Sequence, residues 1–325
     1  MTKYIGRLVN LGIAPESVRG AGLAPTYHVP KTSFSFDDKV ISARSVGSLG
    51  KIADSEEAFV TTLYGEGDIE GEVRSKSFGV FLYALLGSKS VSGPTDSAYT
   101  HTFSVANTNQ HQSLAFVVAD SNTTEMYKLV MLNELELTCE LDQVVTYKAS
   151  FMSKQAVASG ASVPAVVSES KFTKKHLSFK VASNTAGLAA ATAISLKSLS
   201  LKISKNVALD DVLGTAEPED ILNHQLSVEG ELTLNYEDET WKNYMKQATN
   251  KAVEIAFTNT DATIGAGTRP ALKFQLPKVD FLEWEPDISL DDIVTQKVSF
   301  KANYDVANAA DIISLCTLVN DVTSY

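Results

Sequence analysis

The stretch Val145-Thr146-Tyr147-Lys148-Ala149-Ser150-Phe151 recurs 149 residues later as Val294-Thr295-Gln296-Lys297-Val298-Ser299-Phe300, with five of seven positions identical. Both copies alternate apolar and polar residues, as a β-strand does when it buries one face and wets the other. Two further pairs of segments match in the same order, at offsets of 159 and 165 residues. These pairs are Ile69-Glu70-Gly71-Glu72-Val73 with Val228-Glu229-Gly230-Glu231-Leu232, and Ser33-Phe34-Ser35-Phe36 with Ser198-Leu199-Ser200-Leu201. The shared order predicts a duplicated, mainly β fold.

Each half also contains one segment with helical spacing, placed directly after its Glu-Gly-Glu segment. In the first half the apolar residues are Phe78, Phe81, Leu82, Leu85 and Leu86, and Gly87 follows them as a left-handed cap. In the second half they are Trp241, Tyr244 and Met245, preceded by the acids Glu237-Asp238-Glu239 that suit a helix N-terminus. Each unit is therefore predicted to consist of strands, one helix and further strands.

The domain boundaries follow from composition. A stretch of small residues with Gly160 and two serines reads as a linker between the halves. The segment from Gly6 to Pro30 is rich in glycine and proline and shows little alternation, so we expect an extended arm. Behind Asp311, the apolar residues Ile312, Ile313, Cys316 and Val319 predict a short C-terminal helix. The predicted regions are an arm (1–32), a first β-domain (33–155), a linker (156–168), a second β-domain (169–308) and a C-terminal helix or tail (309–325).

Composition places the chain among globular proteins and argues against binding to nucleic acid. The 325 residues are 44% hydrophobic and 21% charged, unlike disordered chains. The net charge of −11 is spread over both halves without a basic cluster that would hold phosphates. No apolar run approaches the about 18 residues that cross a bilayer, and no apolar segment follows the N-terminal charges as in a secretion signal.

Motifs for catalysis or cofactor binding do not emerge from the sequence. The segment Gly65-Glu66-Gly67-Asp68-Ile69-Glu70-Gly71 has the wrong glycine spacing for a phosphate loop, and its acids would repel phosphate, so we expect a turn at a strand edge. Cys139 and Cys316 lie one in each half at non-equivalent positions, which favours buried thiols over a disulfide or a zinc site. We therefore predict no enzymatic activity and no catalytic or cofactor-binding residues.

Metal binding is not indicated either. The five histidines have no metal-ligand spacing and are expected at the surface or in loops; they are His28, His101, His111, His176 and His224. The acids Asp287, Asp291 and Asp292 lack the glycine and terminal glutamate of a calcium loop, so a solvated turn is expected there.

The opening of the chain resembles a known family. The run Gly12-Ile13-Ala14-Pro15-Glu16-Ser17-Val18-Arg19-Gly20-Ala21-Gly22-Leu23-Ala24-Pro25, followed by Val29-Pro30, resembles the start of tail tube (major tail) proteins of long-tailed, non-contractile, siphovirus-type bacteriophages. Those chains often begin with a glycine-containing arm, an acidic residue and a proline-ended strand. The two units that follow, each closing on Val-Thr-x-Lys-x-Ser-Phe, are similar to the tube fold itself. The resemblance covers most of residues 1–305.

The resemblance implies a fold, an assembly and partners. Each unit would be a β-sandwich or half-barrel with a flanking helix, and its inner sheet would join those of neighbouring subunits around a lumen. Stacked rings of such units form the tube through which DNA passes during ejection, without specific binding. Family members commonly present six units per ring, so two units per chain imply a homotrimeric, pseudo-hexameric ring, with a homohexamer as the alternative. The implied partners are tape-measure, tail-tip and terminator proteins, and the implied location is the virion tail, after synthesis in the host cytoplasm.

The acidic composition suits that role, because an acidic or neutral lumen repels phosphate and lets a duplex slide. Candidate lumen-facing acids are Glu70, Glu72, Glu229 and Glu231, since acids alternate with apolar residues on those strands. The N-terminal arm would tie adjacent rings by ordering on a partner surface.

Two other classes of protein compete with this interpretation. Another β-rich structural or adhesion subunit, such as a surface-layer, spike or secretion-tube component, would predict a secretion signal or a ligand groove. An enzyme on a duplicated β-scaffold would predict polar groups that converge in one pocket.

Overall fold

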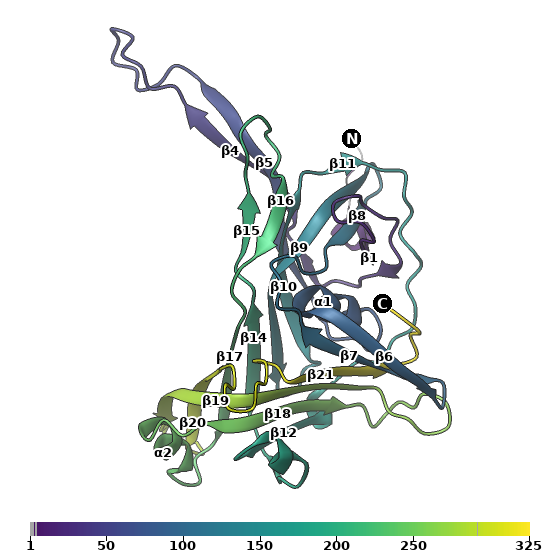
Figure 1. Cartoon of the computed structure of the whole chain (residues 1–325), viewed down its shortest axis with the longest axis vertical. Helices are drawn as coiled ribbons and strands as arrows, with labels where there is room; N and C mark the ends of the chain where they lie inside the picture. Colours follow the sequence, from purple (N-terminus) through teal and green to yellow (C-terminus); the bar gives the residue numbers. More distant parts are fainter. Residues whose placement is uncertain (1–2, 4, 291) are drawn as a thin grey trace.

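The computed structural model of the chain describes residue 3, residues 5–290 and residues 292–325, and it is mainly β. Seven described strands form one antiparallel sheet, the central sheet, which runs from one half of the chain to the other (Figure 1). In spatial order they are β5 (Ala58–Glu72), β10 (Thr146–Lys154), β9 (Thr124–Glu140), β14 (Ser198–Ser204), β17 (Ser227–Asn235), β20 (Thr295–Ala302) and β19 (Ala271–Asp287). The short β3 (Ser33–Phe34) and β4 (Asp37–Arg44) extend it beyond β5.

A second layer covers one face of the central sheet. The strands β9 and β19 are 17 residues long, so each reaches from the central sheet into this layer. There β9 pairs with β8 (Leu114–Ala119), and this ribbon continues through β1 (Asn10–Pro15) and β2 (Tyr27–His28). Around β19 the order is β13 (Ala193–Ile194), β12 (Leu177–Ala182), β18 (Lys251–Thr258), β19, β21 (Leu315–Asn320), β7 (Ala98–Val105) and β6 (Gly87–Thr95).

The remaining elements are short. The strand β11 (Val157–Ala158) pairs with β9, and β15 (Val207–Asp210) pairs with β16 (Asp220–Asn223) in a separate ribbon. Among the described residues, 3-10 helices occupy Gly6–Leu8, Lys174–His176 and Thr185–Ala189.

Both predicted helices are present. The helix α1 (Phe78–Leu86) ends at Gly87, whose φ of 83° is the left-handed conformation that glycine adopts without strain. The helix α2 (Thr240–Lys246) begins after Asp238, whose carboxylate accepts the N–H of Thr240 at 2.8 Å. The start of α1 is held from a distant segment, because Glu169 accepts the N–H of Ser77 at 2.7 Å.

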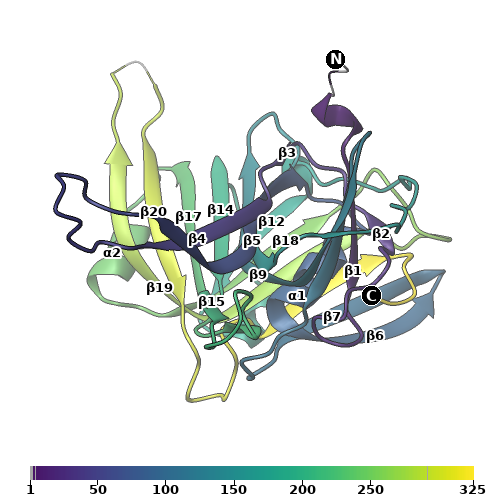
Figure 2. The ribbon, with the colours of Figure 1, turned by 90° about the horizontal axis from the view of Figure 1, so that it is seen from above.

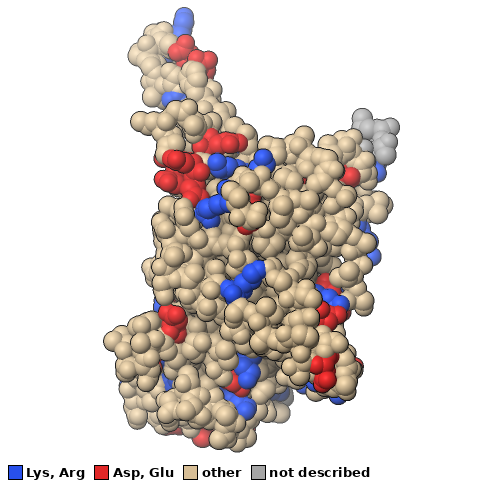
Figure 3. All heavy atoms as spheres, turned by 45° about the vertical axis from the view of Figure 1, so that its right-hand side comes forward, with Lys and Arg blue, Asp and Glu red and all other residues tan. Residues whose placement is uncertain are grey.

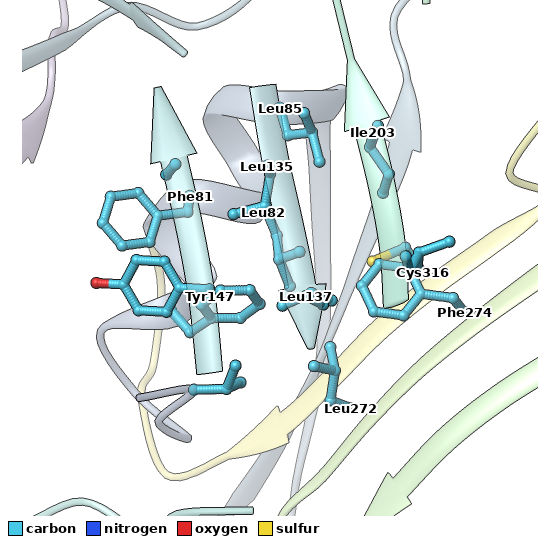
Figure 4. Packing of buried hydrophobic residues seen from close by; sticks show 14 of the residues in the cluster. Phe81, Leu82, Leu85, Leu135, Leu137, Tyr147, Ile203, Leu272, Phe274 and Cys316 are labelled. Atoms are coloured by element: carbon cyan, nitrogen blue, oxygen red, sulfur yellow. The ribbon is translucent and has the colours of Figure 1, made fainter. Parts of the chain in front are cut away.

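The core lies between the central sheet and this second layer. Figure 4 shows Leu82 and Leu85 of α1 close to Leu135 and Leu137 of β9. The ring of Phe81 lies 5.2 Å from that of Tyr147 on β10, centroid to centroid. Because α1 is buried on nearly every side, it reads as hydrophobic all round and not as an amphipathic surface helix.

The two halves share their strand register around one glycine each. On β5, Gly67 lies between Phe36 and Phe151 of the neighbouring strands; on β17, Gly230 lies between Leu201 and Phe300. From Gly67 to Gly230 the offset is 163 residues, so the predicted match of Gly71 with Gly230 is wrong by four residues. The two halves also carry a β-bulge at equivalent positions. It lies directly after Leu132 on β9, which faces Phe151, and directly after Phe281 on β19, which faces Phe300.

Two local predictions, for the segment from Gly65 to Gly71 and for the C-terminal segment, are wrong. The segment from Gly65 to Gly71 is not a turn but lies inside β5, where it pairs with β10 on one side. The C-terminal segment is not helical, because residues 315–320 form β21 between β7 and β19 and bury Cys316 and Leu318. Such long-range pairing overrides a weak local helical spacing.

The predicted N-terminal arm is also part of the body. Leu11 and Ile13 of β1 are fully buried and β1 pairs along its length with β8. The chain then turns around Glu16, whose buried carboxylate accepts the N–H groups of Gly20 at 2.7 Å and Gly22 at 2.9 Å. This segment is therefore tied down by its own chain. The predicted linker holds β11 and otherwise lacks regular structure up to residue 170; the domain boundaries remain predictions.

A hairpin formed by β4 and the first part of β5 projects far from this body (Figures 1 and 2). Every residue of β4 is exposed, as are nearly all residues of the connection at 45–57. The hairpin carries exposed apolar side chains, which are Val40, Ile41, Val46, Leu49, Ile52, Phe59 and Val60.

Candidate functional site

One face of the central sheet is packed against the core, and the other carries charged side chains. The alternation along each strand separates the two, because successive side chains point to opposite faces. On β5, for example, Ile69 and Gly71 are buried while Glu70 and Glu72 are partly exposed. We call the second surface the charged face; it comprises Asp68, Glu70, Glu72, Glu134, Glu136, Glu229, Glu231, Asp280, Glu283, Glu285, Lys148, Lys202, Lys297 and Lys301.

Charges of alternating sign cross this face in one row, one residue from each of the seven strands. In spatial order the row is Glu70, Lys148, Glu136, Lys202, Glu229, Lys301 and Asp280. Opposite charges that face each other across strands stabilise a sheet by roughly 0.2–1 kcal/mol per pair. The row thus favours this register of the strands over one in which a strand is shifted along its neighbour.

Ion pairs link neighbouring strands of the charged face. Lys301 Nζ lies 2.7 Å from Glu229 Oε1, and Lys297 Nζ lies 2.9 Å from Glu231 Oε2. A hydrogen bond and the charge of Glu231 raise the pKa of Lys297. These side chains are 41–49% exposed, so each pair contributes little stability of its own.

The adjacent row contains acids and hydroxyls but no lysine, so the face as a whole is acidic. It runs through Glu72, Thr146, Thr138, Ser200, Glu231, Ser299 and Glu283. With ten acids and four lysines, the charged face has the polarity of a surface that repels phosphate. On the side of the molecule drawn in Figure 3, basic side chains are scattered among acids, and acids gather at the base of the projecting hairpin.

Glu72 ends the acidic row on β5 and is held more firmly than its neighbours. Its Oε2 lies 2.7 Å from Lys171 Nζ and 2.9 Å from Arg74 Nη2. Burial alone would raise the pKa of Glu72, but its hydrogen bonds and ion pairs with Lys171 and Arg74 outweigh burial and lower the pKa. This carboxylate therefore stays charged at neutral pH.

All four acids selected from the sequence lie on the charged face, and sequence reasoning missed its other six acids and its four lysines. The acids of β9 and β19 and the four lysines were not selected. The alternation in the segments 135–141 and 294–304 contained the signal, since their polar positions fall on the same face as those of the neighbouring strands.

Of the histidines expected at the surface or in loops, His101, His111 and His176 are buried, and of these three only His111 lies in a loop. His111 explains why, because its two ring nitrogens lie 3.0 Å from the carbonyl oxygen of Leu85 and 2.6 Å from that of Ala106, at the end of α1. Burial lowers the pKa of His111, and the charge of Lys205 adds to the effect. The buried ring of His111 therefore has a structural role, because it satisfies backbone carbonyl groups at the end of α1. His28 is half-buried and His224 is exposed.

Other candidate centres carry no reactive geometry. Both cysteines are buried and unpaired by disulfide, and burial raises the pKa of the Cys139 thiol to about 11 and that of Cys316 further. Within the residues that the structure describes, no group of three or more His, Cys, Asp or Glu side chains is arranged to hold a metal ion. Asp287 and Asp292 are exposed, whereas Asp291 lies outside the described residues. No described helix has the length and apolarity needed to cross a membrane.

Comparison with models of protein families gives a match. A family model described as phage tail tube protein matches residues 6–302, which is nearly the whole chain. No curated protein matches the sequence.

Proposed function

This chain belongs to the phage tail tube protein family, and from that premise we propose that it polymerises as stacked rings into the tail tube of a long-tailed, non-contractile phage. The chain is then a structural protein of the virion tail. One observation carries the finer proposal: the central sheet is packed on one face and presents an acidic, solvent-exposed surface on the other.

The charged face is proposed to line the lumen. The opposite face is occupied by α1, β8 and the other elements of the second layer, so only the charged face is free to border a channel. DNA that moves along this face meets an excess of carboxylates, among them Glu70, Glu72, Glu229 and Glu231. A surface of the same sign as the phosphates, without a basic cluster, keeps the duplex from binding.

The recurring register supports two copies of one tube unit per chain. Each copy would contribute a glycine-centred row, a helix and a bulged long strand to the wall. If a ring presents six such units, three chains close it with pseudo-sixfold symmetry. A ring of six chains, in which one unit builds the tube and the other decorates it, is the alternative.

The projecting hairpin is proposed to contact the next ring. It extends well beyond the body and carries exposed apolar residues such as Ile52 and Phe59, which would be buried on a neighbour. This role was expected of the N-terminal arm, which instead packs into its own chain. Tape-measure, tail-tip and terminator proteins would meet the ends of the tube.

Electron microscopy of the concentrated, purified chain tests the proposal. Hollow tubes, or end-on rings with six lobes in a rotational power spectrum, are expected, and the native mass of a ring then decides between three chains and six. A chain that stays monomeric is next mixed with tail-tip components, which would supply an initiating surface. Failure to polymerise under that condition as well would overturn the proposal in favour of a different β-rich structural or adhesion subunit.

A further inference from the structure

The two halves of the chain meet in a strand pair that we call the internal seam. Along this seam β9 pairs with β14 in antiparallel register from Glu134–Ser204 to Glu140–Ser198. On the core side Leu137 lies opposite Leu201 and Cys139 opposite Leu199, and all four side chains are buried. On the charged face Glu136 lies opposite Lys202.

The strands equivalent to those of the seam form the two open edges of the central sheet. The bulge after Phe281 makes β19 the counterpart of β9, and the glycine-centred row makes the β3–β4 segment the counterpart of β14. In the part of the chain that the structure describes, the stretch 280–287 of β19 pairs with β20 only, and β3 and β4 pair with β5 only.

The backbone of the β3–β4 edge is oriented for further pairing. The N–H of Ser35 donates to the backbone carbonyl oxygen of Asp68 on β5 at 3.0 Å. In an antiparallel ladder the backbone groups of successive residues point to alternate sides. Those of Phe34 and Phe36 therefore point away from β5, toward the open edge.

We propose that β19 of one chain pairs with the β3–β4 segment of the next chain in the register of the internal seam, so that one kind of seam closes the ring. This inference rests on the proposed function and specifies its contact. Transferring the register places Pro286 opposite Phe36, Ile288 opposite Phe34, Asp287 opposite Ser35 and Glu283 opposite Lys39.

The two edges complement each other on the core side. Ile288 is 73% exposed in the single chain, and Phe34 is only partly buried. The proposed seam would pair them with each other, as the internal seam pairs Cys139 with Leu199. On the charged face Glu283 would gain an opposite charge from Lys39.

Two differences from the internal seam make the proposed seam weaker and sensitive to charge. Glu285 would face Asp37, where the internal seam has Glu136 facing Lys202. Pro286 has no N–H, so its pair with Phe36 lacks one backbone hydrogen bond. Charge and proline on an edge strand are common protections against unregulated pairing. Single chains would thus stay apart until several contacts form together.

Disulfide trapping in assembled tubes tests the register. The pair Ser35→Cys with Asp287→Cys corresponds to Ser200 and Thr138, a non-hydrogen-bonded pair whose Cβ atoms lie close. On oxidation this pair is expected to link neighbouring chains covalently. The largest crosslinked species should contain three chains, or six chains if the ring has six. The double variant Ser200→Cys with Thr138→Cys is expected to close a disulfide within one chain, and Ser35→Cys with Glu285→Cys, slipped by two residues, is expected to remain unlinked.

The outcomes separate the two proposals. Tubes that form but link only through the slipped pair, or through neither pair, would overturn the seam and leave the tube assignment intact. Absence of rings and tubes, even with tail-tip components, would overturn both. A second readout is the concentration at which rings first appear: Asp37→Lys should lower it relative to Asp37→Asn, because lysine restores the opposite charge to Glu285, and equal thresholds for the two variants would contradict the register.

Discussion

The ring of Phe300 lies over Gly230, its direct partner on the adjacent strand of the central sheet. A Cβ on Gly230 would collide with that ring and would lie 2.7 Å from the carbonyl oxygen of Ser200. Phe300 is 1% exposed, so its ring is surrounded by other atoms of the core. Glycine is required here by close approach and not by its backbone angle.

Gly230→Ala is therefore expected to lower the free energy of unfolding by about 1–3 kcal/mol, the usual cost of overpacking a core. The midpoint of urea unfolding measures the change. Gly160→Ala is the matched control, because nothing lies within 4 Å of its added Cβ. Equal midpoints for the two variants would show that the sheet yields at Gly230.

Tyr325 anchors the last residues of the chain against the start of α1. Its ring is 8% exposed, lies 4.7 Å from that of His101, and its hydroxyl donates to the carbonyl oxygen of Lys76 at 2.6 Å. Tyr325→Ala is expected to cost about 3–5 kcal/mol, as for other buried aromatic residues. Thermal unfolding measures it, with Tyr304→Ala as the control because Tyr304 is 49% exposed; a similar loss of stability in both variants would mean that Tyr325 is not an anchor.

Lys205 gives the fold a dependence on pH. It is 1% exposed and donates from Nζ to the carbonyl oxygen of Ala84 at 2.8 Å. Burial, with a smaller effect of the Arg19 charge, lowers the pKa of Lys205 from 10.5 to about 7. Between those values the unfolded chain binds more protons than the folded one. The contribution of Lys205 to stability therefore rises with pH across this window and is lost as pH falls toward 7.

The measurable consequence is a difference between the wild type and Lys205→Met. Between pH 7 and pH 10 the unfolding free energy of the wild type should increase relative to that of the variant, by up to about 1.4 kcal/mol per pH unit. Urea unfolding of both proteins at each pH cancels the titration of other groups. A difference that is constant with pH would show that the end of α1 keeps Lys205 charged.

Charge reversal on the charged face tests its proposed place in the lumen. Tubes of the double variant Glu229→Lys with Glu231→Lys are expected to retain DNA in a salt-dependent manner, because added cations bind phosphates with release of counterions. Co-sedimentation of tubes with short duplexes at increasing salt measures this. The free energy of unfolding should fall by only about 1–2 kcal/mol, because the lost pairs with Lys301 and Lys297 are exposed, although lysines then face lysines across the strands.

The same change of charge on the opposite side of the sheet is the control. Glu237 and Glu239 are exposed next to α2, which packs against β19 on the core side. Glu237→Lys with Glu239→Lys should leave DNA retention inside tubes unchanged. Equal retention by both double variants would place the charged face outside the lumen.

Some features were readable from the sequence because they depend on neighbouring residues. Apolar spacing identified α1 and α2, and Gly87 marked the end of α1. Period-two alternation identified the strands around Tyr147 and Lys297, and hence the acids that share their sheet face. The resemblance to phage tail tube proteins was likewise confirmed, whereas the type of phage stays a prediction.

Other features depended on partners that are distant in the chain. The repeats of Glu-Gly-Glu type were aligned four residues out of register, because Glu66-Gly67-Asp68 and Glu70-Gly71-Glu72 look alike locally. Each of these glycines faces an aromatic residue of β10, and only the pairing of Gly67 with Phe151, which matches that of Gly230 with Phe300, identifies the equivalent position. The strand β1 escaped detection because Gly12, between the buried Leu11 and Ile13, contributes no polar side chain to the alternation.

The sequence by itself determined the β-rich class, the repeated order of strands and helix, and the acidic character of the chain, because these follow from local periodicity and composition. The tertiary structure decided the register around Gly67 and Gly230, the pairing of β9 with β14 across the two halves, and the burial of the N- and C-terminal segments. Those features arise from contacts between residues far apart in the chain, and local sequence patterns do not determine which distant residues pair.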